Sequence, residues 1–230
     1  MTGQVAINEI FGPTVQGEGP MMGRRAVFVR TARCDLSCAW CDTPYTWDWV
    51  NHDPGKEIHN MTLDDVVIQV NMADPAHTCG VVVTGGEPLL QRTTIAVLAN
   101  RLLAGRPWVQ IETNGRHAPP EGLDPKVMIV ASPKLANSGM PHEKRVVRDR
   151  LARLQEWPAT FKFVVTSADD LTEVDQLVAD HGLTDVWVMP EGTTAGKVAA
   201  IDALADQIIE RGYNLSTRMH VTLWGSRRAV

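Results

Sequence analysis

Short apolar runs alternate with helical patterns along the chain, and this alternation predicts its secondary structure. Strands are expected over residues 5–11, 26–33, 81–83, 109–112, 127–131, 161–165 and 186–189. Helices are expected over residues 62–73, 89–103 and 193–211, with a further helix that starts at Ser167. Two of these helices open with capping boxes, which pair Thr62 with Asp65 and Ser167 with Asp170.

The order of these elements sets the fold class. Strands that alternate with helices indicate an α/β protein with a parallel sheet and crossover helices. The 230 residues fit one domain, residues 1–230, but a closed barrel of eight βα units typically needs about 250 residues. We therefore expect an open, partial parallel β/α barrel of about six strands. In such folds, functional groups gather at the carboxyl ends of the strands.

Composition and charge narrow the class of partner. The chain carries 22 basic and 27 acidic residues, a net charge of −5, without a long run of either sign. Because nucleic-acid-binding proteins usually show a basic patch, we expect a small-molecule partner and no nucleic acid. The sequence contains no run of 18 apolar residues, and its first residues lack the pattern of a signal peptide. These features predict a cytoplasmic protein with reduced thiols and no membrane partner.

Three cysteines occupy one short segment after the second predicted strand. Cys34, Cys38 and Cys41 follow the spacing C-x3-C-x2-C, and thiolates this close on a loop are typical of an iron–sulfur cluster. Three ligands on a four-iron cluster leave one iron open to an external ligand. The alternative is a zinc site completed by Cys79 or by a histidine such as His52, although zinc knuckles more often pair two C-x2-C elements. If there is no such zinc site, Cys79 is expected to be a small residue of the hydrophobic core.

A glycine-rich segment, Thr84-Gly85-Gly86-Glu87-Pro88, follows the apolar run at residues 81–83. Because glycine has no Cβ, two successive glycines let the backbone approach a ligand closely. The carboxylate of Glu87 is suited to pair with an ammonium group. The alternative interpretation is an ordinary turn.

These two motifs, in this order, resemble the radical S-adenosylmethionine (SAM) family. The resemblance implies that the open iron chelates SAM, and that electron transfer cleaves SAM to a 5′-deoxyadenosyl radical. It places Trp40 beside the adenine and the backbone of residues 40–42 around it. It also implies that the Gly86-Glu87 segment receives the amino group of SAM.

Further segments resemble one branch of that family, the 7-carboxy-7-deazaguanine synthases, over nearly the whole chain. They are Gln16-Gly17-Glu18-Gly19, Cys41-Asp42-Thr43, Glu112-Thr113-Asn114-Gly115 and Ser132-Pro133-Lys134. The resemblance implies ring contraction of 6-carboxy-5,6,7,8-tetrahydropterin to 7-carboxy-7-deazaguanine with loss of ammonia, for queuosine or another 7-deazapurine. It also implies a Mg2+ ion near Thr43, and hydroxyl and carboxylate oxygens are the hard ligands that Mg2+ prefers.

The resemblance assigns site residues one by one. The reactive group is the radical itself, so no side chain is assigned as catalytic. The expected SAM-binding residues are Trp40, Cys41, Asp42, Gly86, Glu87, Ser132, Pro133, Lys134, Met189, Pro190, Glu191 and Gly192. The expected substrate-binding residues are Val15, Gln16, Gly17, Glu18, Arg30, Thr84, Glu112 and Asn114. Arg30 is expected to pair with the substrate carboxylate through both arms of its guanidinium.

Each assignment has a simpler alternative. Arg30 is also compatible with a surface charge, Thr43 with a turn cap and Lys134 with a solvated loop residue. The short loop between Cys34 and Cys38 lacks the long insert of some relatives, so the tryptophans at 47 and 49 are expected to shape the space above the cluster.

The C-terminal segment and the partners complete the expectations. The chain runs past the terminus of some relatives, whose terminal carboxylate touches substrate; the role of Val230 stays open. His220 is equally compatible with the substrate site and with the core. A flavodoxin or ferredoxin is expected as electron donor, and a homodimer as the assembly. The main rival is a small radical SAM activase that acts on a glycine of a partner protein.

Overall fold

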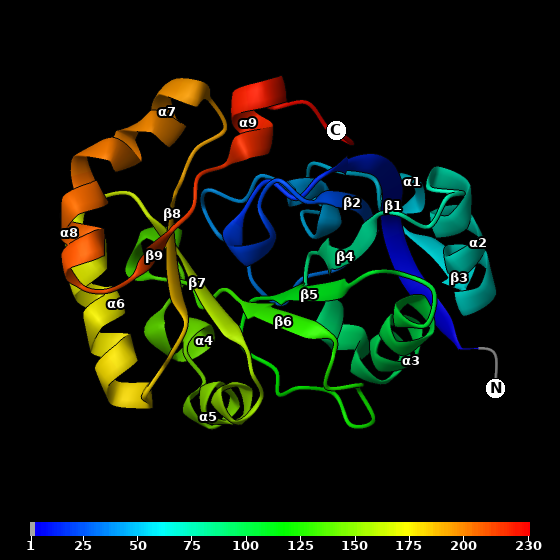
Figure 1. Ribbon diagram of the computed structural model, residues 1–230, viewed down its shortest axis with the longest axis horizontal. Coiled ribbons are helices and arrows are strands. Elements are labelled where there is room, and N and C mark those ends of the chain that lie inside the picture. The colour runs from blue at the N-terminus through cyan, green and yellow to red at the C-terminus, as the bar shows by residue number, and fades with distance from the viewer. Residues whose placement is uncertain (1–2) are drawn as a thin grey trace.

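The computed structural model describes residues 3–230, which form one nine-stranded sheet with helices around it (Figure 1). The order of strands in the sheet is β3-β1-β2-β4-β5-β6-β7-β8-β9. Their bounds are β1 (Gln4–Val15), β2 (Arg25–Thr31), β3 (His59–Thr62), β4 (Gly80–Gly85), β5 (Val109–Thr113), β6 (Met128–Ala131), β7 (Thr160–Val165), β8 (Val186–Pro190) and β9 (Asn214–Leu215). Strand β2 and the strands β4 to β9 pair in parallel with their neighbours along the sheet. Strand β1 pairs antiparallel with both β2 and β3.

Helices connect the strands and cover the outside of the sheet (Figure 1). The α-helices are α1 (Pro54–Glu57), α2 (Leu63–Ala73), α3 (Arg92–Leu103), α4 (His142–Arg145), α5 (Arg148–Glu156), α6 (Ala168–His181), α7 (Ala195–Ala199), α8 (Ala205–Glu210) and α9 (Met219–Trp224). Short 3-10 turns are η1 (Gly19–Met21), η2 (Pro44–Thr46), η3 (Pro88–Gln91), η4 (Ala136–Ser138) and η5 (Ala200–Leu204). Both capping boxes are present, with Asp65 and Asp170 at the third helical position.

The parallel, open α/β sheet confirms the predicted fold class, but two details of the prediction were wrong. Seven strand ranges in a barrel of about six strands were expected, and the described residues form nine strands. The two that the sequence did not reveal, β3 and β9, are too short and polar to give an apolar run. The single helix expected over residues 193–211 is broken into α7, η5 and α8. The tighter 3-10 winding of η5 gives this segment a different side-chain spacing, which buries Val198, Ile201 and Ile208.

Side chains along each strand alternate between the face of the sheet that joins the hydrophobic core and the opposite, polar face. Successive side chains of a strand point to opposite faces of the sheet. The odd-numbered positions of the central strands, such as Val83, Ile111 and Phe163, join the hydrophobic core that the helices cover. The even-numbered positions include Thr84, Glu112 and Lys162, which belong to the opposite face. The polar side chains of that face therefore converge inside the curve of the sheet.

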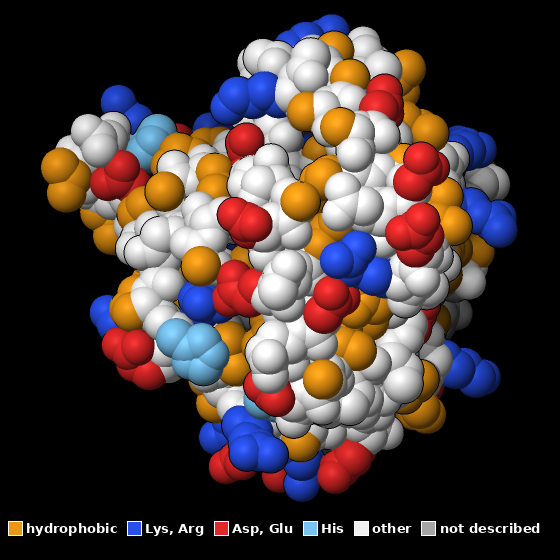
Figure 2. Space-filling model, turned by 90° about the vertical axis from the view of Figure 1, so that its left-hand side faces the viewer, with side chains coloured by type: hydrophobic (Ala, Val, Ile, Leu, Met, Phe, Trp, Pro, Cys, Tyr) orange, Lys and Arg blue, Asp and Glu red, His pale blue; other side chains and the backbone are white. Residues whose placement is uncertain are grey.

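The outer surface shows the acidic balance of the sequence. Figure 2 shows acidic side chains scattered over the face that α6, α7 and α8 form, with basic side chains interspersed among them. Within residues 3–230, no helix combines the length and the apolar character needed to cross a membrane.

Candidate functional site

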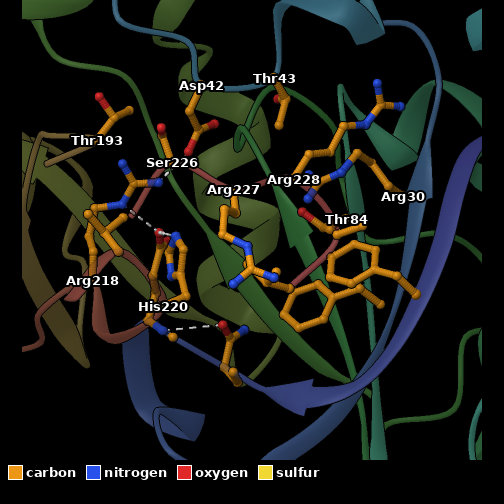
Figure 3. A pocket seen from close by; sticks show the side chains of 18 of the residues that line it. Arg30, Asp42, Thr43, Thr84, Thr193, Arg218, His220, Ser226, Arg227 and Arg228 are labelled. Atoms are coloured by element: carbon orange, nitrogen blue, oxygen red, sulfur yellow. Dashed lines mark hydrogen bonds and ion pairs between the residues drawn. The ribbon is translucent and has the colours of Figure 1, made fainter. Parts of the chain in front are cut away.

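Two adjoining cavities lie where the polar face of the sheet meets the loops. The arginine cavity, of about 260 Å³, is lined by Arg30 of β2 and by Arg227 and Arg228 of the C-terminal segment (Figure 3). The cysteine cavity, of about 170 Å³, is lined by Cys34, Cys38 and Cys41. The two cavities share a wall made of Glu18, Asp42, Thr43, Thr84, Gly85, Glu112 and Arg218.

The cysteine cavity has the chemistry that an iron–sulfur cluster needs. All three cysteines are free thiols, and two sulfurs already accept N–H donors: Trp47 Nε1 lies 3.2 Å from Cys41 Sγ and Leu36 N lies 3.5 Å from Cys34 Sγ. Burial raises the pKa of Cys34 to about 12 and also raises the pKa of Cys38. Each of these thiols must therefore lose a proton when it binds iron. The residues present fit the cluster.

The zinc alternative fits less well. Cys79 is fully buried just before β4, at the amino end of that strand, whereas Cys34 follows the carboxyl end of the neighbouring parallel strand β2. Cys79 therefore belongs to the core, as the sequence predicts, and is remote from the cysteine loop. Among residues 3–230, no three His, Cys, Asp or Glu side chains are arranged to hold a single metal ion. A tetrahedral zinc site needs its ligands within about 2.0–2.3 Å of one ion, while a cluster takes each thiolate on a different iron.

The two glycines after β4 allow the backbone to pass close to the cysteine loop. A Cβ at Gly86 would lie 2.1 Å from the carbonyl oxygen of Arg33, the residue before Cys34. A Cβ at Gly85 would lie 2.2 Å from the carbonyl oxygen of Thr31, and its φ of +139° is one that other residues rarely adopt. The absence of a Cβ at these positions thus lets β4 pack against the backbone of β2 and of the cysteine loop, and a close approach to a ligand stays a prediction.

Glu87 is fully buried, and its carboxylate is occupied by protein donors. Oε1 accepts hydrogen bonds from the backbone N–H of Leu89 and the hydroxyl of Thr113, each at 2.8 Å, and Oε2 accepts one from the backbone N–H of Asn114 at 2.6 Å. Burial raises the pKa of Glu87. These contacts tie the ends of β4 and β5 together, and a contact of this side chain with SAM stays a prediction.

Asp35 links the cysteine loop to the segment that follows β5. Its carboxylate accepts hydrogen bonds from Asn114 Nδ2 at 2.7 Å and from the guanidinium of Arg116, and lies 3.0 Å from His117 Nε2. Burial raises the pKa of Asp35, but hydrogen bonds from His117 and Asn114 and the charge of Arg116 lower it below its usual value overall. The loop that carries Cys34 is thus held in place by charge and by directed hydrogen bonds.

On one side of the cysteine cavity, three of the residues predicted to bind SAM form a compact group. Lys134 Nζ donates to Ser132 Oγ at 3.0 Å and lies 5.5 Å from the ring centroid of Trp40. Trp40 in turn donates from Nε1 to Asn137 Oδ1 at 3.1 Å. Lys134 is therefore half-buried above an aromatic ring, which argues against the alternative of a freely solvated loop residue.

In the arginine cavity, Arg30 is oriented by a carboxylate. Its Nε donates to Glu9 Oε1 at 2.7 Å, and Tyr45 donates to the same oxygen at 3.3 Å. The side chain of Arg30 is only 16% exposed, which excludes the alternative of an ordinary surface charge. Among the described residues, the two terminal nitrogens of Arg30 have no hydrogen-bond acceptor. They are therefore available to donate to a ligand. Phe11 and Phe28 stack beside it with centroids 5.1 Å apart.

The floor of the arginine cavity is polar. Gln16 Nε2 donates to Glu112 Oε1 at 3.0 Å, and Thr84 Oγ1 donates to Glu112 Oε2 at 3.0 Å. Three segments that are remote in sequence thus place an amide, a hydroxyl and a carboxylate side by side. Such a set offers donors and acceptors to a flat, nitrogen-rich ring.

A network of charged side chains, which the sequence analysis missed in part, lies in and beside the shared wall. Glu18 accepts from Lys162 Nζ at 2.6 Å and from Arg218 Nε at 2.9 Å, and Arg218 also pairs with Asp42. Burial raises the pKa of Glu18, but Lys162, Arg218 and His220 lower it well below its usual range overall. His220 Nε2 lies 4.0 Å from Glu18 Oε1, and its pKa is lowered mainly by burial. His220 therefore faces the cavity (Figure 3).

Most of the predicted residues line one of the two cavities. Those in the arginine cavity are Val15, Gln16, Gly17, Glu18, Arg30, Thr84 and Glu112, and Asn114 lines the cysteine cavity. The predicted SAM-binding residues in the cysteine cavity are Trp40, Cys41, Asp42, Gly86, Ser132, Lys134, Met189, Pro190 and Glu191. Glu87, Pro133 and Gly192 line neither cavity.

The C-terminal segment closes one side of the arginine cavity, with Val230 among its lining residues. Arg228 Nε donates to Glu9 Oε2 at 2.8 Å, its Nη2 donates to Glu57 Oε2 at 2.9 Å, and its guanidinium carbon lies 3.9 Å from the ring centroid of Tyr45. Glu9 therefore joins the C-terminal segment to Arg30. Sequence analysis found no signal for this arrangement beyond the length of the segment.

Several known proteins are similar to this chain. A family model described as the Radical SAM superfamily matches residues 28–125. The 7-carboxy-7-deazaguanine synthase of Pyrobaculum aerophilum is 36% identical over 99% of this chain and 98% of that protein. The chain belongs to the 7-carboxy-7-deazaguanine synthase family. The synthase of Halobacterium salinarum is also similar, at 35% identity over 95% of this chain and 90% of that protein.

A solved structure has the same architecture. The crystal structure of QueE from Escherichia coli matches with a TM-score of 0.71 and 29% identity, covering 94% of this chain and 95% of that one. This match confirms the open radical SAM fold. The roles of individual residues in this member of the family stay predictions.

Proposed function

We propose that the chain is a 7-carboxy-7-deazaguanine synthase, which converts 6-carboxy-5,6,7,8-tetrahydropterin to 7-carboxy-7-deazaguanine with loss of ammonia. The product would enter the queuosine or another 7-deazapurine pathway. The observation that carries the proposal is the wall shared by the two cavities. A radical made in one cavity must reach a carbon of a substrate in the next one without passing through water, and a common wall allows this.

The cysteine cavity would hold a 4Fe-4S cluster on Cys34, Cys38 and Cys41, with SAM beside it. When bound, the cluster supplies the electron that cleaves SAM to a 5′-deoxyadenosyl radical. The residues of the chain would position SAM and the cysteine loop and would exclude water. Lys134 and Trp40 would flank SAM, and the ties made by Asp35 would keep the cysteine loop in place.

The arginine cavity would hold the pterin. The free terminal nitrogens of Arg30 would donate hydrogen bonds to the pterin carboxylate. A guanidinium group binds a carboxylate best through two such parallel hydrogen bonds. Gln16, Thr84 and Glu112 would meet the ring nitrogens and the exocyclic groups. The stacked rings of Phe11 and Phe28 supply an apolar wall.

A Mg2+ ion is proposed beside Thr43, which lies in the shared wall with Asp42. A hydroxyl, a carboxylate and a substrate carboxylate together offer the oxygen ligands that this ion prefers. Thr43→Ala should weaken the response of turnover to added Mg2+, while Thr43→Ser should retain most of it. A metal response that is unchanged in Thr43→Ala would remove this role.

Anaerobic turnover tests the main proposal. The reconstituted protein, SAM, a reductant and 6-carboxy-5,6,7,8-tetrahydropterin should give the ultraviolet absorbance of a deazaguanine, and Cys38→Ala should abolish it together with SAM cleavage. Cleavage of SAM by the wild-type protein without any deazaguanine would refute the synthase assignment. That outcome would favour a radical SAM enzyme with a different substrate.

Two further expectations rest on the family resemblance. A flavodoxin or ferredoxin should reduce the cluster, which the rate of SAM cleavage with each donor measures. The chain should form a homodimer, which light scattering of the anaerobic protein measures.

A further inference from the structure

Arg218, in the shared wall, hydrogen-bonds to three segments that are predicted to bind either SAM or the pterin. It is 8% exposed. Its Nε donates to Glu18 Oε1 at 2.9 Å, its Nη1 donates to the carbonyl oxygen of Gly192 at 2.6 Å, and its Nη2 pairs with Asp42 Oδ2. Figure 3 shows the side chain between Asp42 and His220.

In the proposed function, one of these three partners belongs to the pterin site and the other two belong to the SAM site. Glu18 lies in the segment predicted to meet the pterin. Asp42 follows the last cluster cysteine, in the segment predicted to hold the adenine. Gly192 ends the segment predicted to close over SAM. A displacement of any one segment therefore changes a charge-assisted hydrogen bond to the same guanidinium.

The backbone around Arg218 strengthens the link to the pterin side. Met219 N donates to the carbonyl oxygen of Gly17 at 2.9 Å, and Ser216 Oγ accepts from Gly19 N at 3.1 Å. A Cβ at Gly17 would lie 2.1 Å from His220 Nδ1, so the two segments pack without space between them. Residues 16–19 and residues 216–220 must consequently move together.

We propose that Arg218 is a positioning residue that couples the binding of SAM to the binding of the pterin. This inference rests on the proposed function. When the pterin fixes Glu18, the guanidinium is fixed as well, and it then holds the segments of Asp42 and Gly192 in the arrangement that receives SAM. The same coupling limits the cleavage of SAM in the absence of substrate. Couplings between sites typically amount to factors of about 5–150 in affinity.

A thermodynamic cycle tests the coupling. Anaerobic calorimetry on the reconstituted enzyme would give the Kd of SAM with and without saturating 6-carboxypterin, an oxidised analogue of the substrate. The wild-type enzyme should bind SAM roughly five-fold or more tightly when the pterin is present. In Arg218→Met this ratio should fall to about 1, and Arg218→Lys should restore part of it because a positive charge remains near Glu18. Arg211→Met, which removes an arginine paired with Asp175 outside both cavities, is the matched control and should keep the wild-type ratio.

A second readout separates positioning from a general loss of structure. Arg218→Met should retain its iron and should release more 5′-deoxyadenosine per deazaguanine than the wild-type enzyme does. An unchanged affinity ratio in Arg218→Met, or an equal Kd for SAM with and without pterin in a wild-type enzyme that forms product, would overturn the coupling alone. A wild-type enzyme that forms no deazaguanine would instead overturn the proposed function.

Discussion

Gly86→Ala is the substitution whose cost the structure defines best. The new Cβ would lie 2.1 Å from the carbonyl oxygen of Arg33, 2.5 Å from its carbonyl carbon and 3.0 Å from Cys34 N. Real Cβ atoms essentially never come closer than 3.0 Å to such atoms, so the backbones must separate by roughly 1 Å. Two hydrogen bonds lie at this contact, from Gly86 N to Thr31 O at 3.1 Å and from Glu87 N to Arg33 O at 2.8 Å.

Overpacking of this kind costs about 1–3 kcal/mol, and each weakened hydrogen bond adds about 1 kcal/mol. We expect Gly86→Ala to lower the free energy of unfolding by about 3 kcal/mol, or the Tm by roughly 6–12 °C for a chain of this size. Because Arg33 leads directly into Cys34, the bound iron per chain should also fall.

Thermal unfolding followed by circular dichroism, together with iron analysis of the anaerobic protein, measures both effects. Gly196→Ala in α7 is the matched control, since its Cβ would meet no atom within 4 Å. The control should change stability by less than about 1 kcal/mol. A Gly86→Ala protein that melts within about 2 °C of the wild type and binds a full complement of iron would show that the close approach is not required.

Three further predictions concern the charges of the arginine cavity. Arg30→Ala should raise the KM for the pterin roughly 30-fold or more while the iron content stays unchanged, because a partly buried charge partner is lost; steady-state kinetics with iron analysis measures both. The lowered pKa of Glu18 stabilises the fold at neutral pH, and this contribution begins to decline near the ordinary value of 4.5 and is lost as the pH falls through the lower pKa of the folded state. The difference in urea stability between the wild type and Glu18→Gln should therefore shrink from pH 7 to pH 4, and an equal difference at both would contradict the role of Lys162 and Arg218. Arg228→Ala should free the C-terminal segment, so that carboxypeptidase releases Val230 faster than from the wild type.

The features that the sequence predicted are those that depend on neighbouring residues. The spacing of the three cysteines, the glycine pair at 85–86 and both capping boxes are local patterns, and their positions in the structure follow from the strands beside them. The alternation of apolar runs also predicted the parallel sheet, because each buried strand is continuous in sequence.

The features that it missed depend on contacts between distant segments. Lys162 and Glu18 are 144 positions apart, and Arg218 and Glu18 are 200 apart. Lys162 is an even-numbered position within an apolar strand, and such a lysine suggests a polar interior, but no pattern names its partner. The tie from Asp35 to Asn114, Arg116 and His117 likewise requires the pairing of β2 and β5 with β4.

The position of the C-terminus has a practical consequence for work with this enzyme. Val230 lines the arginine cavity, and Arg228 connects that segment to Glu9 and so to Arg30. An affinity tag fused after Val230 would start at the lining of the arginine cavity and would disturb the contact between Arg228 and Glu9, the carboxylate that orients Arg30. Gly3, by contrast, lies beside Thr94 of α3 and lines neither cavity. Purification tags are therefore better placed at the other end of the polypeptide.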